Sequence, residues 1–283
     1  MGAAWPNLFI PGAPKAGTTA LWHYLGEHPE IYMSPLKEPG FLARDPGGGG
    51  IHDEQSYLRL FAKASDEKWR GEASTAYFSD DSSPSRIKAV SPDSKIIISL
   101  RDPVERAYSD YWYYVRRNME ERSFREAVDQ ALPGHARAPR TGPVNHYVDR
   151  GFYVARLERY LSLFGENVLV LFQEELRGDA SSELRKVCEF LDVDPGFAQD
   201  LSQEAQNEFE LPRSWLGARL VRSPALLAVG RRLPKAPRRK VVKLVTVKSR
   251  KPKMDAETRE LLRTLYEPEC EPLQRLLARP LPW

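Results

Sequence analysis

The sequence has little that would stabilise a small secreted domain or cross a membrane. Only two of its 283 residues are cysteine, Cys188 and Cys270, and their spacing matches no metal site. Both are therefore expected to be free thiols in a reducing compartment. No run of 18 apolar residues indicates a membrane-spanning helix. The first apolar run begins about eight residues after Met1, so we expect no secretory signal and a cytoplasmic protein.

Acidic residues are missing from one long segment of the chain. Residues 211–254 contain 14 Lys and Arg and no Asp or Glu. Removing these 14 from the 42 basic residues leaves 28 against 39 acidic ones, so the remainder carries a net charge of −11. This asymmetry predicts that the basic segment faces an anion. Within it, residues 215–233 could form a membrane-surface helix, a lid over an acceptor, or a solvated helix face.

The rest of the composition is typical of one large domain. Hydrophobic residues make up 41% of the chain, and no internal repeat is present, so we expect a single domain over residues 1–283. The apolar runs at 95–100 and 167–172 are typical of strands buried in a parallel sheet. A shorter strand is expected at 30–33. Helices are predicted at 57–64, 123–132 and 147–164.

Residues 8–25 combine an apolar run, a turn rich in glycine and proline, and apolar residues at helical spacing. A strand, a tight loop and a helix in this order form a phosphate cradle. Gly12 and Gly17 allow close backbone approach, and the N–H groups of the first helical turn point at the anion. Lys15 adds a flexible positive charge. The helix N-terminus also carries two hydroxyls, those of Thr18 and Thr19.

This loop departs from the Walker pattern of nucleoside triphosphatases. That pattern would require lysine where the chain has Thr18, and the only lysine of the loop lies earlier, at Lys15. The loop therefore indicates a smaller, differently charged group than a triphosphate with Mg²⁺. An ordinary turn between a strand and a helix is the alternative interpretation.

A second candidate anion site follows the strand at 95–100. Pro103 fits the first turn of a helix, where its missing N–H costs nothing. Arg101 at the strand end and Ser109 two helical turns later can then converge on one anion. This pair and the first loop both follow strands, where ligands bind in open α/β sheets. The alternative for Arg101 is a salt bridge with Asp102 or Glu105.

The segments 14–21 and 101–111 resemble the two phosphate sites of sulfotransferases that use 3′-phosphoadenosine 5′-phosphosulfate (PAPS). The heparan-sulfate-type and bacterial branch is the most similar. This resemblance implies a P-loop-NTPase-like α/β fold, a three-layer sandwich with a central parallel sheet. The sequence has no carboxylate pair arranged for Mg²⁺, so we expect no metal. The resemblance assigns PAPS binding to Lys15, Ala16, Gly17, Thr18, Thr19, Arg101 and Ser109, with Lys15 also catalytic.

The resemblance points to a general base as well. Residues 37–41 are similar to the family's Lys-Glu-x-x-Phe segment, whose glutamate is the base, and this assigns the role to Glu38. A carboxylate at a strand end, within reach of Lys15, could take the proton that an alcohol or amine loses. Without the resemblance, a solvated Lys-Glu pair would be the preferred interpretation. His52, which follows a run of four glycines, is an alternative base.

Residues 69–78 resemble another segment of the family, Glu-Lys-x-x-x-Tyr-Phe. Ala73 occupies the lysine position, so one cationic contact of the family is missing. Glu72 remains either a residue that orients the acceptor or an alternative base.

Residues 248–255 resemble the family's late Lys-Gly-Arg loop, which closes over the nucleotide. Lys248, Ser249 and Arg250 are predicted to contact the nucleotide, although serine replaces the glycine and the loop is one residue shorter. Asp255 is expected to cap a final helix.

Taken with the resemblance, these motifs predict an enzyme that moves a sulfuryl group from PAPS to a hydroxyl or amine and releases 3′-phosphoadenosine 5′-phosphate (PAP). The acceptor stays open among a carbohydrate, a lipid and a small natural product; we expect no nucleic acid partner. Peripheral contact with an anionic surface is assigned to residues 211–254. The alternatives are a P-loop nucleotide kinase or NTP-binding protein, and a non-catalytic anion-binding module.

Overall fold

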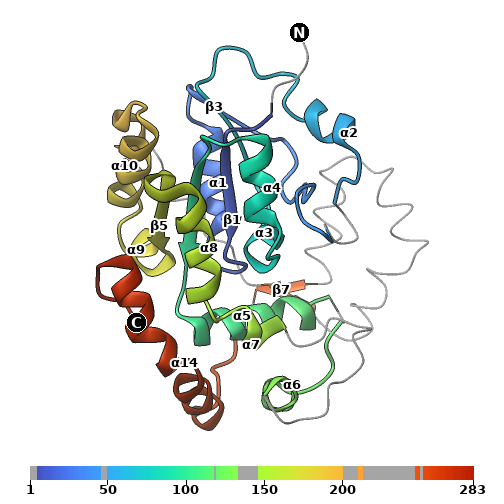
Figure 1. Cartoon of the computed structure of the whole chain (residues 1–283). Helices are drawn as coiled ribbons and strands as arrows, with labels where there is room; N and C mark the ends of the chain where they lie inside the picture. Colours follow the sequence, from blue (N-terminus) through green and yellow to red (C-terminus); the bar gives the residue numbers. More distant parts are fainter. Residues whose placement is uncertain are drawn as a thin grey trace, which may run out of the picture.

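A computed structural model describes residues 5–45, 50–117, 119–132, 146–199, 210–212, 246–248 and 251–283. Its centre is a five-stranded parallel sheet with the strand order β2-β3-β1-β4-β5. Figure 1 shows this sheet with helices on both faces. Its strands are β1 (Leu8–Gly12), β2 (Ile31–Met33), β3 (Trp69–Ala73), β4 (Lys95–Leu100) and β5 (Val168–Phe172).

The central strands are apolar because both faces of the sheet are covered. Every residue of β1 is buried, and so is every residue of β4 except Lys95. β1 pairs with β3, Leu8 facing Gly71, and with β4, Leu8 facing Lys95. The predicted strand at 95–100 is confirmed residue for residue, and the one at 167–172 begins one residue later than expected.

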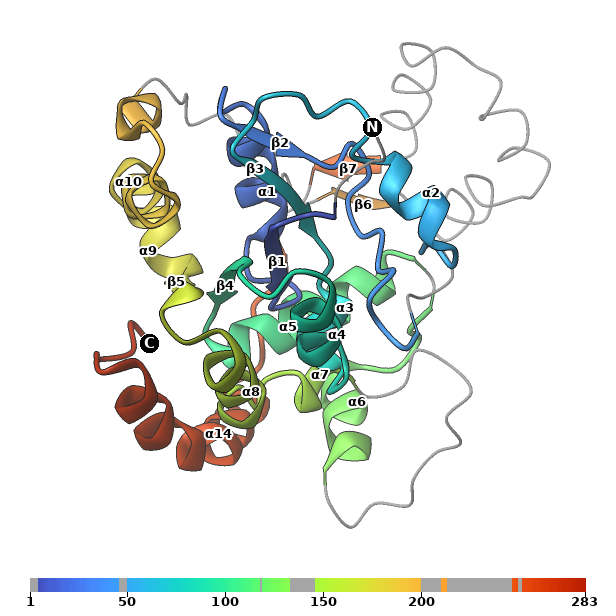
Figure 2. The ribbon, with the colours of Figure 1, turned by 45° about the horizontal axis from the view of Figure 1, so that its top comes forward.

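Two helical layers enclose the sheet, which confirms the expected three-layer α/β architecture. On one face, α1 (Thr18–Gly26) and α10 (Ala180–Leu191) pack on Leu8, Ile10 and Ile97. On the other face, α4 (Ser83–Val90) and α8 (Val154–Phe164) pack on Phe9, Ile96 and Ile98. Figure 2 shows the two layers on opposite sides of β1.

A third apolar cluster lies beyond the carboxyl ends of the strands. There α5 (Pro103–Val115), α6 (Phe124–Ala131) and α7 (His146–Asp149) pack with the long α14 (Ala256–Leu277), and Figure 1 shows all four below the sheet. The Asp255 side chain accepts from the Thr258 N–H at 2.7 Å, which confirms the predicted cap of the last helix. The remaining elements are α2 (Glu54–Arg59), α3 (Ala76–Ser79), α9 (Gln173–Gly178), η1 (Gly165–Asn167), η2 (Pro195–Gln199), β6 (Glu210–Pro212) and β7 (Thr246–Lys248).

Two predicted helices have different bounds in the structure. The helix expected at 57–64 runs from Glu54 to Arg59, because Asp53 caps it by accepting from the Ser56 N–H at 2.8 Å. The single helix expected at 147–164 is split into α7 and α8. At the split, a Cβ on Gly151 would lie 2.6 Å from the ring of Tyr266, whose hydroxyl donates to the Val148 carbonyl. The close approach of α14 therefore ends α7.

Both cysteines are free thiols, as expected from the sequence. Cys188 is buried and Cys270 is partly buried. Among the described helices, none is both long and apolar enough to span a membrane.

Candidate active site

The loop between β1 and α1 is fastened to the end of the neighbouring strand β4. The Ala13 N–H donates to the carbonyl oxygen of Ser99 at 2.7 Å. In the other direction, the Ser99 hydroxyl donates to the Ala16 carbonyl at 2.6 Å. Ser99 and Ala16 are fully buried, so these bonds form out of contact with water. The loop is thereby held in one shape at the carboxyl edge of the sheet.

The two loop glycines meet different requirements. A Cβ on Gly12 would lie 2.5 Å from the Cβ of Phe78, so this position admits no side chain. Gly17 has φ +90°, a conformation that residues with a side chain rarely adopt. Gly17 is also the N-cap of α1 and gives it no side-chain cap. The first N–H groups of α1, at Thr18 and Thr19, are therefore left to bind an anion.

Lys15 lies in this loop, next to an aromatic side chain of α5 and a cationic side chain that follows α5. Its Nζ is 4.5 Å from the ring centroid of Tyr113, and the Arg117 guanidinium is 4.1 Å from the same centroid. Burial lowers the pKa of Lys15 to about 8; Asp110 opposes this shift, whereas Arg116 and other nearby cations add to it. An anion bound next to Lys15 would raise this pKa again and so favour the charged form.

Arg101 follows β4 and reaches the loop that carries Lys15. Its Nη1 donates to the Lys15 carbonyl at 3.2 Å. Its Nη2 is 3.9 Å from a Glu105 carboxylate oxygen, so the salt bridge considered from the sequence is present but long. Ser109, on the same helix, is half-buried, and its hydroxyl has no partner among the described side chains and backbone groups. Arg101 and Ser109 can thus both donate hydrogen bonds to a ligand.

Helix α5 is fixed by a buried ion pair. Arg106 is fully buried, and its Nη1 lies 3.2 Å from the Asp110 carboxylate, which also lies 3.5 Å from Nη1 of Arg150. Arg106 also donates to the Tyr147 carbonyl of α7. This network sets the position of the helix that carries Ser109 and Tyr113.

Lys251 is a candidate site residue that the sequence interpretation did not single out. Its Nζ lies 3.9 Å from the ring centroid of Tyr108 and 4.0 Å from Glu105, the carboxylate that also faces Arg101. Burial lowers the pKa of Lys251 to about 8, opposed by Glu105 and assisted by Arg101. The Tyr108 hydroxyl donates to the Pro252 carbonyl at 2.9 Å and holds this part of the late segment on α5.

The predicted late contacts lie one to three residues before Lys251. Ser249 and Arg250 are outside the residues that the structure describes, and Lys248 is described only as part of the backbone of β7. The run Lys248–Lys253 contains four cations, so the basic stretch itself was the available signal. The choice among its members depends on packing against Tyr108.

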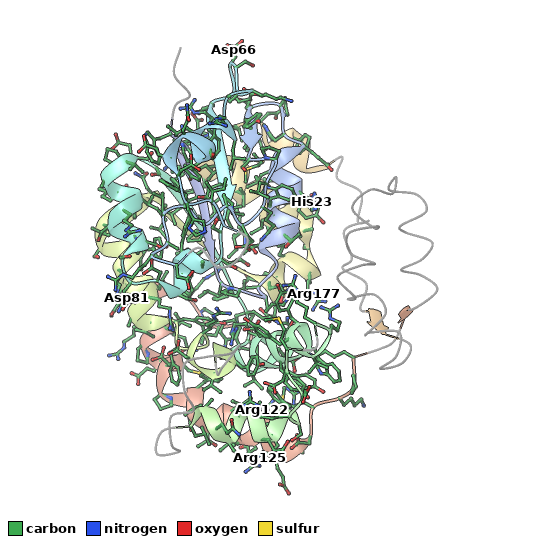
Figure 3. The ribbon with its side chains drawn as sticks, turned by 90° about the vertical axis from the view of Figure 1, so that its right-hand side faces the viewer. His23, Asp66, Asp81, Arg122, Arg125 and Arg177 are labelled. Carbon is green, nitrogen blue, oxygen red and sulfur yellow. The ribbon has the colours of Figure 1, made fainter. Side chains whose placement is uncertain are left out.

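A further cation lies near Arg101 and Lys251. Arg177 of α9 lowers the pKa of both, after burial and closer charges. Figure 3 shows Arg177 where the sheet meets the helices below it. Arg101, Lys251 and Arg177 thus lie near one another at the carboxyl edge of the sheet, beside the carboxylates of Glu105 and Glu174.

Glu38 follows β2 by five residues in the chain and lies next to the carboxyl end of β3 in space. Its N–H donates to the Ala73 carbonyl at 2.9 Å, and its carboxylate accepts from the Thr75 N–H at 2.7 Å and from Lys37 at 2.6 Å. The carboxylate is 44% exposed, so a substrate can reach it. No contact with Lys15 is formed. The two residues instead lie around Tyr113, whose pKa is raised by burial and, to a smaller extent, by the Glu38 charge.

The alternative bases differ in their surroundings. Glu72 is fully buried and accepts from Tyr57, Ser74 and Tyr77. It cannot touch an acceptor, so the structure argues against both roles considered for it from the sequence. Ala73, at the family's lysine position, is also fully buried. His52 is exposed before α2 and contacts neither Lys15 nor Glu38 among the described residues.

Within the ranges that the structure describes, no three His, Cys, Asp or Glu side chains form a group that could hold a metal ion.

Comparison with known proteins identifies a domain that covers most of the chain. Residues 6–211 match the family model described as the sulfotransferase domain. Among solved structures, a sulfotransferase from Alicyclobacillus acidocaldarius is 31% identical; the match covers 98% of both chains with a TM-score of 0.72.

Curated relatives of known name are longer than this chain. Carbohydrate sulfotransferase 15 of Mus musculus is 29% identical in an alignment of 247 positions, which covers 67% of this chain and 44% of the relative. The mouse bifunctional heparan sulfate N-deacetylase/N-sulfotransferase 4 is 28% identical over 295 residues, covering 98% of this chain and 31% of the relative. The chain thus spans less than half the length of these relatives.

Proposed function

The chain belongs to the sulfotransferase domain family, and from this we propose that it transfers a sulfuryl group from PAPS to an acceptor hydroxyl or amine and releases PAP. The observation that supports this most directly is the bond between Arg101 and the Lys15 carbonyl. This bond joins the two candidate anion-binding elements, which follow the adjacent strands β1 and β4. A donor with a 5′-phosphosulfate and a 3′-phosphate needs two such elements.

We assign the 5′ end of the donor to the loop and the 3′ end to α5. The N–H groups of Gly17, Thr18 and Thr19 and the ammonium of Lys15 bind the phosphosulfate. Arg101 and Ser109 bind the 3′-phosphate, and Lys251 adds a third contact on the same side. Lys248, Ser249 and Arg250 stay proposed contacts from the sequence.

In the proposed reaction, Glu38 removes the proton from the acceptor as the acceptor atom attacks sulfur in line. A bond forms between that atom and sulfur while the bond from sulfur to the bridging oxygen breaks, and PAP leaves with the electron pair. Lys15 and the first N–H groups of α1 stabilise the negative charge on the bridging oxygen. The chemistry is positioning and electrostatics, as in phosphoryl transfer.

For the acceptor we propose a glycan. The relatives named above are a carbohydrate sulfotransferase and a heparan sulfate N-sulfotransferase. The cations Arg116 and Arg117 at the end of α5 lie near Lys15 and would suit a negatively charged chain. Contact of residues 211–254 with an anionic surface, and a cytoplasmic location, stay proposals; the free thiols of Cys188 and Cys270 support the latter.

The proposed donor is tested by titrating the purified protein with PAP and with its analogue that lacks the 3′-phosphate, using calorimetry. We expect PAP to bind at least tenfold more tightly than the analogue, because charge-assisted bonds contribute about 1.5–3 kcal/mol. The Arg101→Ala variant should lose this preference. Equal binding of both nucleotides, or none, would contradict the assignment. Mg²⁺-stimulated ATP hydrolysis would instead favour a nucleoside triphosphatase.

A further inference from the structure

Glu72 is a fully buried carboxylate to which the proposed reaction gives no role. One of its oxygens accepts from the hydroxyls of Tyr57 at 2.8 Å and Tyr77 at 2.5 Å, and the other accepts from Ser74 at 2.5 Å. All three donors are neutral, and no cation forms a salt bridge with it among the described residues. Burying a carboxylate without a cation costs free energy, so we expect its three hydrogen bonds to have a structural role.

Two of the three hydroxyls that donate to Glu72 also accept hydrogen bonds from backbone N–H groups in the segment after Glu38. The Ser74 oxygen accepts the Gly40 N–H at 2.9 Å. The Tyr77 oxygen accepts the Leu42 N–H at 3.2 Å. A hydroxyl has one proton and two lone pairs, so a hydroxyl that donates to Glu72 keeps its lone pairs for the amides. The buried carboxylate therefore fixes the direction of both hydroxyls.

Glu38 is itself held by the residues next to Glu72 in the chain. Its N–H donates to Ala73 and its carboxylate accepts from Thr75. Its φ of +62° is uncommon for a residue with a side chain, so its backbone needs support from its neighbours. The segment from Glu38 to Leu42 is thus attached to β3 and α3 by a row of bonds that has Glu72 at its centre.

We propose that Glu72 is a positioning residue, which holds the segment 38–42 through Ser74 and Tyr77 so that the Glu38 carboxylate stays directed at the acceptor. This inference rests on the proposed function, in which Glu38 is the base. Glu72 touches neither donor nor acceptor and acts through Glu38. It also gives the Glu72…Tyr77 spacing of the family segment a physical reason, since those two side chains bond directly.

The protonation state of Glu72 matters for this role. Burial raises the pKa of Glu72 to about 7; Ser74, Tyr77 and Tyr57 lower it, and the charge of Glu38 raises it further. A protonated Glu72 has a proton of its own to donate, so one of the three hydroxyls must accept from Glu72 and redirect its own proton. That hydroxyl oxygen then has a single lone pair left for a backbone N–H, so the attachment of the segment 38–42 should weaken as the pH falls below about 7.

The network offers a matched control. Ser74→Ala and Tyr77→Phe each remove a link between Glu72 and the segment 38–42. Tyr57→Phe removes a bond of similar length to the same carboxylate but no link to that backbone, and it keeps the ring that stacks on Phe41 at 4.7 Å. A merely structural role for the cluster would make the three variants alike.

Hydrogen exchange measured by NMR tests the attachment without any substrate. In Glu72→Gln, the side chain can accept at only one of the two positions where the carboxylate accepts. The hydroxyl at the position taken by the NH₂ group must reorient, so the Gly40 amide (through Ser74) or the Leu42 amide (through Tyr77) should exchange at least tenfold faster. Ser74→Ala should affect Gly40, Tyr77→Phe should affect Leu42, and Tyr57→Phe should affect neither. Unchanged exchange at both amides in Glu72→Gln would overturn the inference.

Kinetics with PAPS and unsulfated heparosan as the probe acceptor test the effect on transfer. Glu72→Gln should lower kcat by about 10- to 100-fold, the cost of misplacing a catalytic group by an ångström or less, while the KM for PAPS changes less than twofold. In a Glu38→Gln background the same substitution should have no further effect. An equal loss in both backgrounds, or unchanged kcat in Glu72→Gln, would overturn the inference.

The two proposals fail in different ways. A wild-type protein that neither binds PAP nor transfers sulfate would overturn the proposed function, and with it the catalytic part of this inference. Wild-type transfer that depends on Glu38 but not on Glu72 would overturn this inference alone.

Discussion

Arg101 donates a hydrogen bond to the main-chain carbonyl of Lys15 at 3.2 Å, and this bond joins the ends of two adjacent strands. It fixes the distance between the two anion-binding elements from within the protein. Neither element has to be brought into place by the ligand. A donor of the right length therefore meets a largely preorganised site, which reduces the entropy that binding costs.

Donor binding should depend on pH through Lys15 and Lys251. Burial lowers the pKa of each to about 8, and a bound anion raises it again. Below pH 8 both are already charged, so binding takes up no proton. Above pH 8 binding must take up as many as two protons, and the affinity for PAP should fall as pH rises. Calorimetry at pH 9 in buffers of different ionisation enthalpy measures this uptake.

The control for this experiment is Lys15→Arg, since a guanidinium stays charged at pH 9. It should reduce the proton uptake by about one. Uptake that is the same in the variant as in the wild type would show that Lys15 does not titrate with binding.

Replacing Glu38 by glutamine should lower kcat by at least about 10²-fold, because the acceptor loses its general base. The affinity for PAP should stay the same, since Glu38 contacts no part of the donor loop in the described structure. Transfer from radiolabelled PAPS and PAP calorimetry measure the two effects. Glu54→Gln, on the exposed first turn of α2, is the matched control. A Glu38→Gln enzyme with full activity would remove Glu38 from the role of base.

Lys251 can be tested against a lysine two residues away. Lys251 faces Tyr108 and Glu105, whereas Lys253 is exposed. Lys251→Ala should weaken PAP binding by about tenfold, the effect of losing one charge-assisted contact. Lys253→Ala should change it little. Equal losses in the two variants would indicate a general effect of charge instead of a contact.

The Ser99→Ala variant should destabilise the protein by about 1–3 kcal/mol, because the buried Ala16 carbonyl loses its donor. It should also weaken PAP binding, since that bond holds the donor loop. Urea unfolding measures the first effect and calorimetry the second. Ser162→Ala removes an exposed hydroxyl bond on α8 and should stay within about 0.5 kcal/mol of the wild type. A stable Ser99→Ala variant with normal PAP binding would show that the loop keeps its shape without this bond.

The parts that could be predicted from the sequence are those set by local patterns. The buried strand at 95–100 followed from its continuous apolar run, and the start of α5 followed from Pro103. The loop around Lys15 followed from its glycines between a strand and a helix. Each of these depends on residues that are close together in the chain.

The parts that were missed depend on contacts between distant segments. Glu72 and the exposed Glu38 look alike in sequence, and only the hydroxyls of Tyr57 and Tyr77 make one of them a buried residue. Lys251 was not distinguished from its basic neighbours because Tyr108, more than 100 residues earlier, selects it. Tyr113 also escaped notice, since an aromatic residue on a helix usually belongs to a core.

The order of strands in the sheet has a consequence for the synthesis of the protein. β1 is made first among the strands, yet its partners β3 and β4 begin at Trp69 and Lys95. During synthesis on a ribosome, β1 therefore stays unpaired for on the order of ten seconds before β4 has been made. The donor loop cannot acquire its final shape earlier, because Ser99 and Arg101 are part of that later segment. Nascent chains stopped before β4 should thus expose β1 to chaperones and be unable to bind nucleotide.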